Sequence, residues 1–280
     1  MTERSISPAE GWAVLACCMA ASIVAIVWSC RHGAMLNYGD AVAHLHIARR
    51  VFDSRTPRIS QLGSVWLPLP HILLIPFVQN YRWWATGFAG VIPSAIAYVA
   101  SCAGLYRLAR RWLSPAAAAL ALAFFALNPN LLYLQTTAMT EPLFLCEMIW
   151  IVVWLVEWHT CLDYDAKKAG RLQICIAAAL VAAIYTRYDG WIIALLAWTG
   201  VGFTLLKRGP ADERGRLFSS AFWLASVAVV AAPLLWFAYN SVCFGDWLYF
   251  ARGPFSAKAI ELRTSTPGAW PLHPGWHNLS

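Results

Sequence analysis

Two carboxylates and one arginine stand at the ends of apolar segments, at three separate places in the sequence. Asp40 follows Gly39 after one apolar segment, Glu141 opens another, and Arg187 lies in a short connection between two more. Ionisable groups near a membrane interior are costly, so they are usually paired or functional. If the three share one membrane face, they suit a reaction centre, in which the guanidinium of Arg187 can bind a phosphate.

Asp40 and His44 each allow a structural and a chemical interpretation. Considered alone, Asp40 is best explained as a helix N-cap. His44 lies one turn further along the chain, so the two side chains share a helix face and can pair or bind one divalent ion. Two ligands are too few to predict a metal site. The sequence therefore indicates no definite cofactor, while a divalent metal stays open.

Glu141 and Arg187 have structural alternatives as well. Glu141 stands between Thr140 and Pro142, a pattern typical of a helix start. Arg187 either pairs with Asp189 in a turn or binds phosphate through its fork of donors. Further arginines that could bind phosphate, or anchor to anionic lipid head groups, occur in the first long loop. They are Arg49, Arg50, Arg55 and Arg58.

The composition indicates an integral membrane protein. Of the 280 residues, 60% are hydrophobic and only 12% are charged, and the mean hydropathy is +0.55. Soluble domains carry about 25% charged residues. The net charge of +7 comes from short clusters between apolar segments. Because no basic stripe with interleaved aromatic residues is present, we do not expect nucleic acid as a partner.

Seven apolar segments are long enough, or nearly so, to cross about 30 Å of hydrocarbon. They are 12–29, 87–106, 115–134, 142–158, 172–185, 191–206 and 218–239. The expected fold is all-α: a polytopic membrane helix bundle with about seven transmembrane helices.

Three parts follow from this division. Residues 1–240 form the transmembrane module, and 31–85 form a long extracytoplasmic first loop within it. In that loop, 40–52 has the spacing of an amphipathic surface helix, and 67–78 is apolar but too short to span. The tail, 241–280, carries no further span, and we expect it to be the start of a further C-terminal region.

Basic residues in the short connections predict the orientation. Ten of them fall on one side of the predicted membrane, and only Arg187 falls in the short connections on the other. Such an excess marks the cytoplasmic side, which places the N-terminus there and Asp40 outside. We expect a multi-pass protein of the plasma membrane, which in a bacterium is the inner membrane. The ten are Arg107, Arg110, Arg111, Lys167, Lys168, Arg171, Lys207, Arg208, Arg214 and Arg216.

Several short motifs follow one another along most of the chain. They are Tyr38-Gly39-Asp40, Trp66-Leu67-Pro68-Leu69-Pro70-His71, Ile92-Pro93-Ser94-Ala95, Arg110-Arg111, Asn128-Pro129 ahead of Thr140-Glu141, Thr186-Arg187 with Gly190, and Phe244-Gly245-Asp246. Taken in order, they resemble the GT-C glycosyltransferases, which use polyprenyl-phosphate sugars. The likeness is greatest to the protein O-mannosyltransferase and lipid A aminoarabinose transferase branch.

The resemblance implies sugar transfer from a lipid-linked donor to an acceptor hydroxyl, with inversion. Asp40 matches the family's general base, Glu141 its second acidic position, and Arg187 a basic residue beside the donor phosphate. Relatives in the aminoarabinose branch carry a lysine before the prolines of the first loop, where this chain has Val65-Trp66-Leu67-Pro68. His71 or a loop arginine would replace it.

The predicted substrate-binding residues are therefore His44, His71, Arg58, Arg187 and Asp189. The expected partners are the lipid-linked donor and an acceptor protein, lipid or glycan. The alternative function is that of a secondary transporter, although transporters place ionisable residues near the bilayer midplane, and here they gather at one interface. An inactive membrane scaffold would explain the helices but not the carboxylates.

Overall fold

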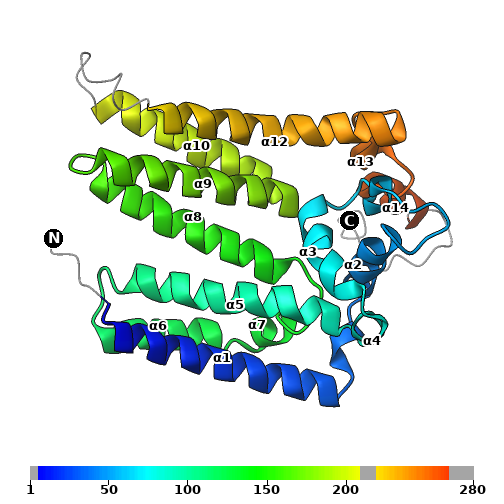
Figure 1. Cartoon of the computed structure of the whole chain (residues 1–280), viewed down its shortest axis with the longest axis horizontal. Helices are drawn as coiled ribbons and strands as arrows, with labels where there is room; N and C mark the ends of the chain where they lie inside the picture. The colour runs from blue at the N-terminus through cyan, green and yellow to red at the C-terminus, as the bar shows by residue number, and fades with distance from the viewer. Residues whose placement is uncertain (1–5, 209–218, 265–280) are drawn as a thin grey trace, which may run out of the picture.

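The protein is a bundle of nearly parallel and antiparallel helices (Figure 1). The computed structural model describes residues 6–208 and 219–264, and all regular structure in these ranges is helical. Six helices in this part of the chain are long and apolar enough to cross a membrane. They are α1 (Pro8–Arg31), α5 (Phe88–Ala109), α8 (Glu141–Cys161), α9 (Ala166–Thr186), α10 (Asp189–Arg208) and α12 (Ser220–Phe244). The predicted all-α polytopic membrane bundle is confirmed.

The third predicted span, 115–134, is two short helices, α6 (Pro115–Ala126) and α7 (Pro129–Leu134). The side-chain oxygen of Asn128 accepts hydrogen bonds from the backbone amides of Asn130 at 3.0 Å and Leu131 at 3.3 Å, which starts α7 afresh. Pro129 has no amide hydrogen with which to continue α6. Two short helices, α6 and α7, therefore replace one of the seven predicted continuous helices, and they run along α1 (Figure 1).

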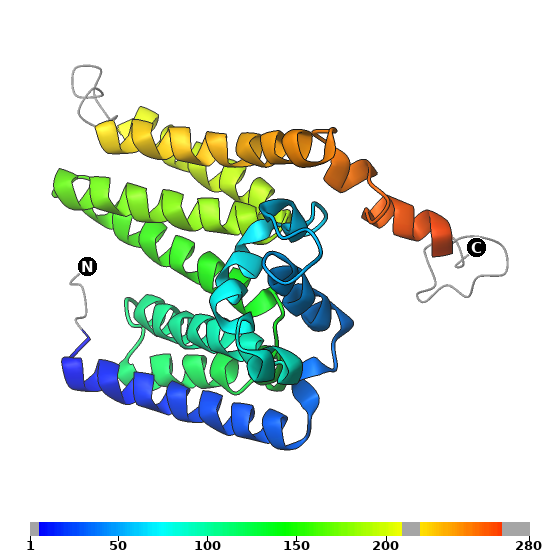
Figure 2. The same ribbon diagram turned by 45° about the vertical axis from the view of Figure 1, so that its right-hand side comes forward.

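The long helices pack as two groups that meet where α5 contacts α8. Helices α8, α9, α10 and α12 share one apolar core, and α1, α5, α6 and α7 share another. Figure 2 shows the two groups from a second side. Large apolar side chains on the outer surface, such as Phe124, Leu196 and Val227, are exposed. An apolar exterior on this scale suits a lipid environment.

The remaining elements gather at one end of the bundle (Figures 1 and 2), called here the loop end. They are η1 (Ala34–Leu36), α2 (Gly39–Arg50), η2 (Ile59–Leu62), α3 (Pro68–Val78), α4 (Tyr81–Thr86), α13 (Tyr249–Arg252) and α14 (Ala257–Thr264). Helix α2 closely matches the amphipathic segment predicted at 40–52, and α3 covers nearly all of the apolar segment predicted at 67–78.

The opposite end, called here the paired end, holds several of the basic residues that predicted orientation. Arg110 Nε lies 2.5 Å from Glu10 Oε1, and Arg107 Nε lies 2.5 Å from Glu157 Oε1. Arg214, Arg216 and 265–280 of the predicted tail lie outside the described residues. The proposed division into a module at 1–240 and a tail at 241–280 stays a prediction.

Candidate active site

Glu141 is positioned by a buried, non-helical segment, 135–140, that joins α7 to α8. Non-helical backbone at membrane depth requires protein partners for its polar groups. Ser22 Oγ of α1 donates to Gln135 Oε1 at 2.9 Å, and Ser29 Oγ lies 2.8 Å from Thr136 Oγ1. These bonds hold the segment against α1.

Two glycines allow the close approaches that bring the site together. A Cβ on Gly90 of α5 would lie 2.5 Å from the Cβ of Ala138, so only glycine lets α5 touch segment 135–140 this closely. A Cβ on Gly190 would collide with the backbone carbonyl of Ala183. The turn between α9 and α10, which carries Arg187, is tight for this reason.

A cavity of about 330 Å³ at the loop end brings together most of the predicted site residues. Asp40 reaches it from α2, Glu141 from the start of α8 and Arg187 from the α9–α10 turn. Its lining residues are Asp40, His44, Trp66, Leu67, Met139, Thr140, Glu141, Thr186, Arg187, Tyr188 and Asp189. Five of the seven predicted site residues therefore share one cavity, while their roles in chemistry stay predictions.

Arg187 is the centre of the polar contacts in this cavity. Its Nη1 lies 3.0 Å from Glu141 Oε1 and 3.2 Å from Thr140 Oγ1, and its Nε lies 3.2 Å from Asp189 Oδ2. Its Nη2 makes no hydrogen bond to any residue that the structure describes. The predicted turn pair with Asp189 exists, but a second carboxylate, from a distant part of the chain, holds the same guanidinium.

Asp40 has no hydrogen bond or ion pair to the described parts of the chain. Its helix, α2, has Tyr38 as N-cap and no side-chain cap bond. The N-cap explanation of Asp40 is therefore not observed, and its exposed carboxylate faces the cavity unpartnered. Thr140 likewise makes no side-chain cap bond for α8.

His44 lines the cavity, and His71 lies behind it. His44 Nδ1 is 2.8 Å from His71 Nε2, and the side of the His44 ring packs against Trp66. Burial lowers the pKa of His44 to about 4, opposed by the charge of Asp40 and reinforced by that of Arg187. Burial also lowers the pKa of His71 to about 3. Both rings are therefore neutral at neutral pH.

Two predicted substrate-binding residues do not line the cavity. His71 is fully buried, with 0% of its surface exposed, because it supports His44 from α3. Arg58 is exposed on the loop before η2 and is absent from the cavity wall. Neither residue is therefore placed to replace the missing lysine at this cavity. Arg49 is also occupied, since its Nε bonds Asp53 Oδ2 at 2.7 Å.

The sequence interpretation missed Glu147 and Tyr188. Thr186 lines the cavity, and its Oγ1 donates a hydrogen bond at 2.7 Å to Oε1 of Glu147, which lies inside the bundle. The only signal for Glu147 was its acidic side chain within the apolar segment that also carries Glu157. The Tyr188 hydroxyl donates to the Val65 carbonyl at 3.1 Å, and burial raises the pKa of Tyr188. This bond ties the first loop to the α9–α10 turn.

The described residues offer no ready-made metal centre. Within 6–208 and 219–264, no group of three or more His, Cys, Asp or Glu side chains is arranged to hold an ion. Asp40 and His44 would supply at most two protein ligands, so any divalent ion there would need ligands from a substrate or water.

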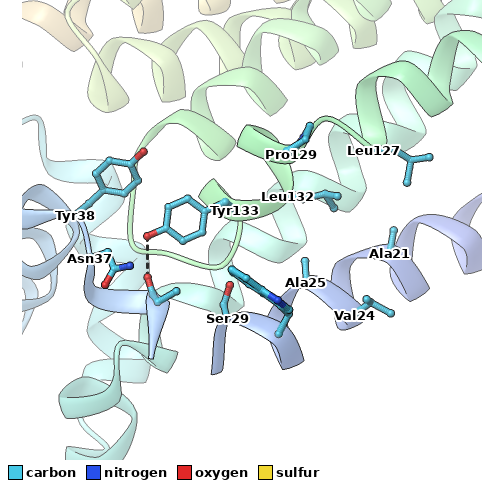
Figure 3. A pocket seen from close by; sticks show the side chains of 12 residues that line it. Ala21, Val24, Ala25, Ser29, Asn37, Tyr38, Leu127, Pro129, Leu132 and Tyr133 are labelled. Carbon is cyan, nitrogen blue, oxygen red and sulfur yellow. Dashed lines mark hydrogen bonds between the residues drawn. The ribbon is translucent and has the colours of Figure 1, made fainter. Parts of the chain in front are cut away.

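An apolar groove of about 760 Å³ lies between α1 and the α6–α7 break. Ala21, Val24 and Leu127 mark one end of it, and Asn37 and Tyr38 the other (Figure 3). The Tyr133 hydroxyl donates to the Ala34 carbonyl at 2.8 Å and so fixes the polar end. Because Tyr38 precedes Asp40 by two residues, the groove ends close to the cavity along the chain.

Comparison with protein-family models, with curated proteins and with solved structures gives no match to this chain. The resemblance to GT-C glycosyltransferases therefore stays an expectation, and the multi-pass membrane bundle rests on the helices themselves.

Proposed function

We propose that this protein is a membrane glycosyltransferase that moves a sugar from a polyprenyl-phosphate donor to an acceptor hydroxyl, with inversion. One observation carries the proposal. Asp40, Glu141 and Arg187 come from three distant parts of the chain and line one cavity at one end of a bundle of apolar helices.

Asp40 is the general base in the proposed reaction. The acceptor hydroxyl gives its proton to the Asp40 carboxylate while its oxygen forms a bond to the anomeric carbon of the sugar. The bond from that carbon to the phosphate oxygen breaks, and the lipid phosphate leaves with the electron pair. The absence of a hydrogen-bond partner for Asp40 in the described chain supports this role, because the carboxylate is not already committed.

Arg187 stabilises the negative charge on the departing phosphate. Its Nη1 and Nε are held by Glu141 and Asp189, while Nη2 is left for a ligand within the described structure. A guanidinium fixed in this way stabilises developing charge without having to reorganise first. Glu141 therefore acts through Arg187 as a positioning residue.

The apolar groove beside α1 supports a lipid-linked donor. An isoprenoid chain buries only apolar surface, and the groove offers apolar side chains along most of its length. Its polar end lies at Asn37 and Tyr38 (Figure 3), and Tyr38 precedes Asp40 by two residues in the chain. In this arrangement, the chain of the donor lies along α1 and its phosphate enters the cavity.

The proposed orientation rests on the basic residues in the short connections between the long helices. We place the paired end, with Arg107, Arg110 and Arg111, in the cytoplasm, and the cavity outside the plasma membrane. Labelling of single introduced cysteines by an impermeant reagent, at Asp53 in the first loop and at Asp163 between α8 and α9, tests this. Labelling of intact cells at position 163 but not at 53 would reverse the assignment.

The decisive experiment replaces Asp40 by asparagine. In membranes supplied with prenyl-phosphate sugars, Asp40→Asn is expected to abolish transfer while insertion and thermal stability are retained. Asp53→Asn, an exposed aspartate of the same loop, is the matched control and should transfer normally. Full activity of Asp40→Asn would overturn its role as base. Movement of the sugar lipid across sealed vesicles, without transfer, would favour the transporter.

A further inference from the structure

His44 and His71 form a buried pair at the cavity wall that the proposed reaction does not use. His44 is 3% exposed and lines the cavity, whereas His71 is 0% exposed and does not. Two rings joined by a 2.8 Å bond must share one hydrogen between them, because two lone pairs facing each other would repel. The pair therefore fixes which nitrogen of each ring carries a proton.

The surroundings of His71 decide between the two arrangements. Its Nδ1 is buried and makes no hydrogen bond to the described chain. The Leu67 backbone favours the protonated form of the ring, and because Nε2 is turned to His44, we assign this interaction to Nδ1. With a hydrogen on Nδ1, neutral His71 has a lone pair on Nε2 and must accept from His44 Nδ1–H. Neutral His44 then has no hydrogen on Nε2.

The free nitrogen of His44 is directed toward the cavity. The two ring nitrogens of histidine point in widely different directions, and Nδ1 is turned to His71, which lies outside the cavity wall. His44 makes no other hydrogen bond to the described parts of the chain. Its Nε2 is thus an acceptor in a wall whose neighbours include the donor Arg187 and the carboxylates of Asp40 and Glu141.

We propose that His71 holds His44 in the Nδ1–H form, so that His44 Nε2 accepts a hydrogen bond from a hydroxyl of the sugar donor. This inference rests on the proposed function, since it names a contact of the same substrate. His44 is a specificity-determining residue that touches substrate, and His71 is a positioning residue that acts through it. A charged histidine would be a donor and would lose this contact.

The charged groups around the pair agree with a neutral acceptor. Burial lowers the pKa of His44 and of His71 far enough that both stay neutral from pH 7 down to about pH 5. The groups that act on them from neighbouring elements are Asp40 on α2, Arg187 on the α9–α10 turn and Arg50 at the end of α2. Glu141 and Asp189 face the same cavity.

Two substitutions at His44 separate its two nitrogens. Asparagine places an amide NH₂ near the position of Nδ1, so His44→Asn keeps the bond to His71 and removes the cavity acceptor. Glutamine reaches the position of Nε2, so His44→Gln restores an acceptor in the cavity. We expect His44→Asn to raise KM for the sugar donor about tenfold, with little change in kcat. This is the typical loss when one hydrogen bond is removed that forms equally in the ground state and the transition state.

The glutamine variant and a control complete the kinetic test. His44→Gln should recover much of the affinity for donor, although its thermal unfolding midpoint should fall because the His71 bond is lost. His46→Asn, on the same helix but outside this cavity, should behave as wild type. If the pair is only structural, His44→Asn will have a normal KM, and that result would overturn the proposal.

The tautomer is measured independently of transfer. Nitrogen NMR of the ¹⁵N-histidine-labelled protein in detergent, assigned by comparison with His44→Asn and His71→Asn, should show His44 protonated at Nδ1 and not at Nε2. The reverse pattern would overturn the inference even if transfer occurs. An absence of transfer by the wild type with prenyl-phosphate sugars would instead remove the proposed function, and the sugar contact with it.

Discussion

The two ends of the bundle differ in their carboxylates: the loop end has paired ones, such as Glu141 and Asp53, but it also has one without a partner among the described residues. At the paired end, Glu10 Oε1 accepts hydrogen bonds from both Arg110 and Tyr106. Glu157 accepts hydrogen bonds from two nitrogens of Arg107. At the loop end, Asp40 has no partner in the described chain, although it lines a cavity.

The same contrast appears in individual oxygens. Glu141 uses Oε1 on Arg187, while its Oε2 is buried without a hydrogen bond in the part of the chain that the structure describes. Unsatisfied buried acceptors are rare, and they call for an explanation such as a ligand. The paired end is built for stability, whereas the loop end keeps acceptors open at some cost in stability.

Loss of the Arg187 guanidinium should give the largest effect in this comparison. Arg187→Gln removes the cation that both Glu141 and Asp189 hold, and transfer should fall about 100-fold, as when one preorganised charge-stabilising donor is removed. Initial rates in membranes measure this. Arg208→Gln at the paired end, where Arg208 bonds Asp163, is the control and should keep its rate. Equal losses in both variants would remove the distinction between the ends.

Glu141→Gln should have a smaller effect on the same reaction. Glutamine still offers an oxygen to Arg187, but the charge that fixes the guanidinium is gone, so we expect a loss of about tenfold in kcat/KM. Glu141→Asp is the matched variant that keeps the charge and should recover part of the rate. A fully active Glu141→Gln would show that Arg187 is positioned without it.

Acidification should destabilise the loop end through its histidines. The pKa of His44 and of His71 in the folded protein lies below the usual value near 6.5, so the unfolded chain binds more protons as the pH falls from 6.5 toward 4. Between pH 7 and 6 each histidine should cost roughly 0.7 kcal/mol of stability.

Thermal unfolding in detergent checks the sign of that dependence. The midpoint should drop between pH 7 and pH 6, and the drop should be smaller in His71→Asn. The exposed His32 provides a control, since His32→Asn should keep the wild-type pH dependence. A midpoint that rises on acidification would contradict the neutral pair.

Breaking an ion pair at the paired end should have the smallest effect. Glu157→Gln removes the negative charge that pairs with Arg107 but keeps a side-chain oxygen, and because the Arg107 side chain is 51% exposed, the loss of stability should be about 0.5 kcal/mol. Transfer should be unchanged, since the pair lies far from the cavity along α8. A large fall in activity would show that the two ends are coupled.

The fold and the site differed in how far the sequence predicted them. Apolar length alone located the long helices, and the spacing of Ala41, Leu45 and Ala48 predicted α2, whose buried face these residues form. The third predicted span, 115–134, ran through Asn128, although an Asn-Pro pair carries both a cap and a missing amide hydrogen and so favours a helix break.

The sequence predicted chiefly those site residues that are charged and lie beside long apolar segments. Asp40, Glu141 and Arg187 are conspicuous for that reason. The position of His71 behind the cavity wall could not be predicted, because nothing in the sequence says that α3 turns this ring toward His44. Pairings between residues far apart in the chain, such as Thr186 with Glu147, depend on helix packing that local patterns do not encode.

The termination of α6 at Ala126 has a consequence for depth. The number of residues between Ser114 and Asn128 sets how far below the loop end the floor of the apolar groove lies. A helix rises about 5.4 Å per turn, so inserting one turn into α6 would shift that floor by about the reach of one isoprene unit. If the proposed lipid-linked donor occupies the groove, the length of this short helix sets the depth at which its tail leaves the surrounding bilayer.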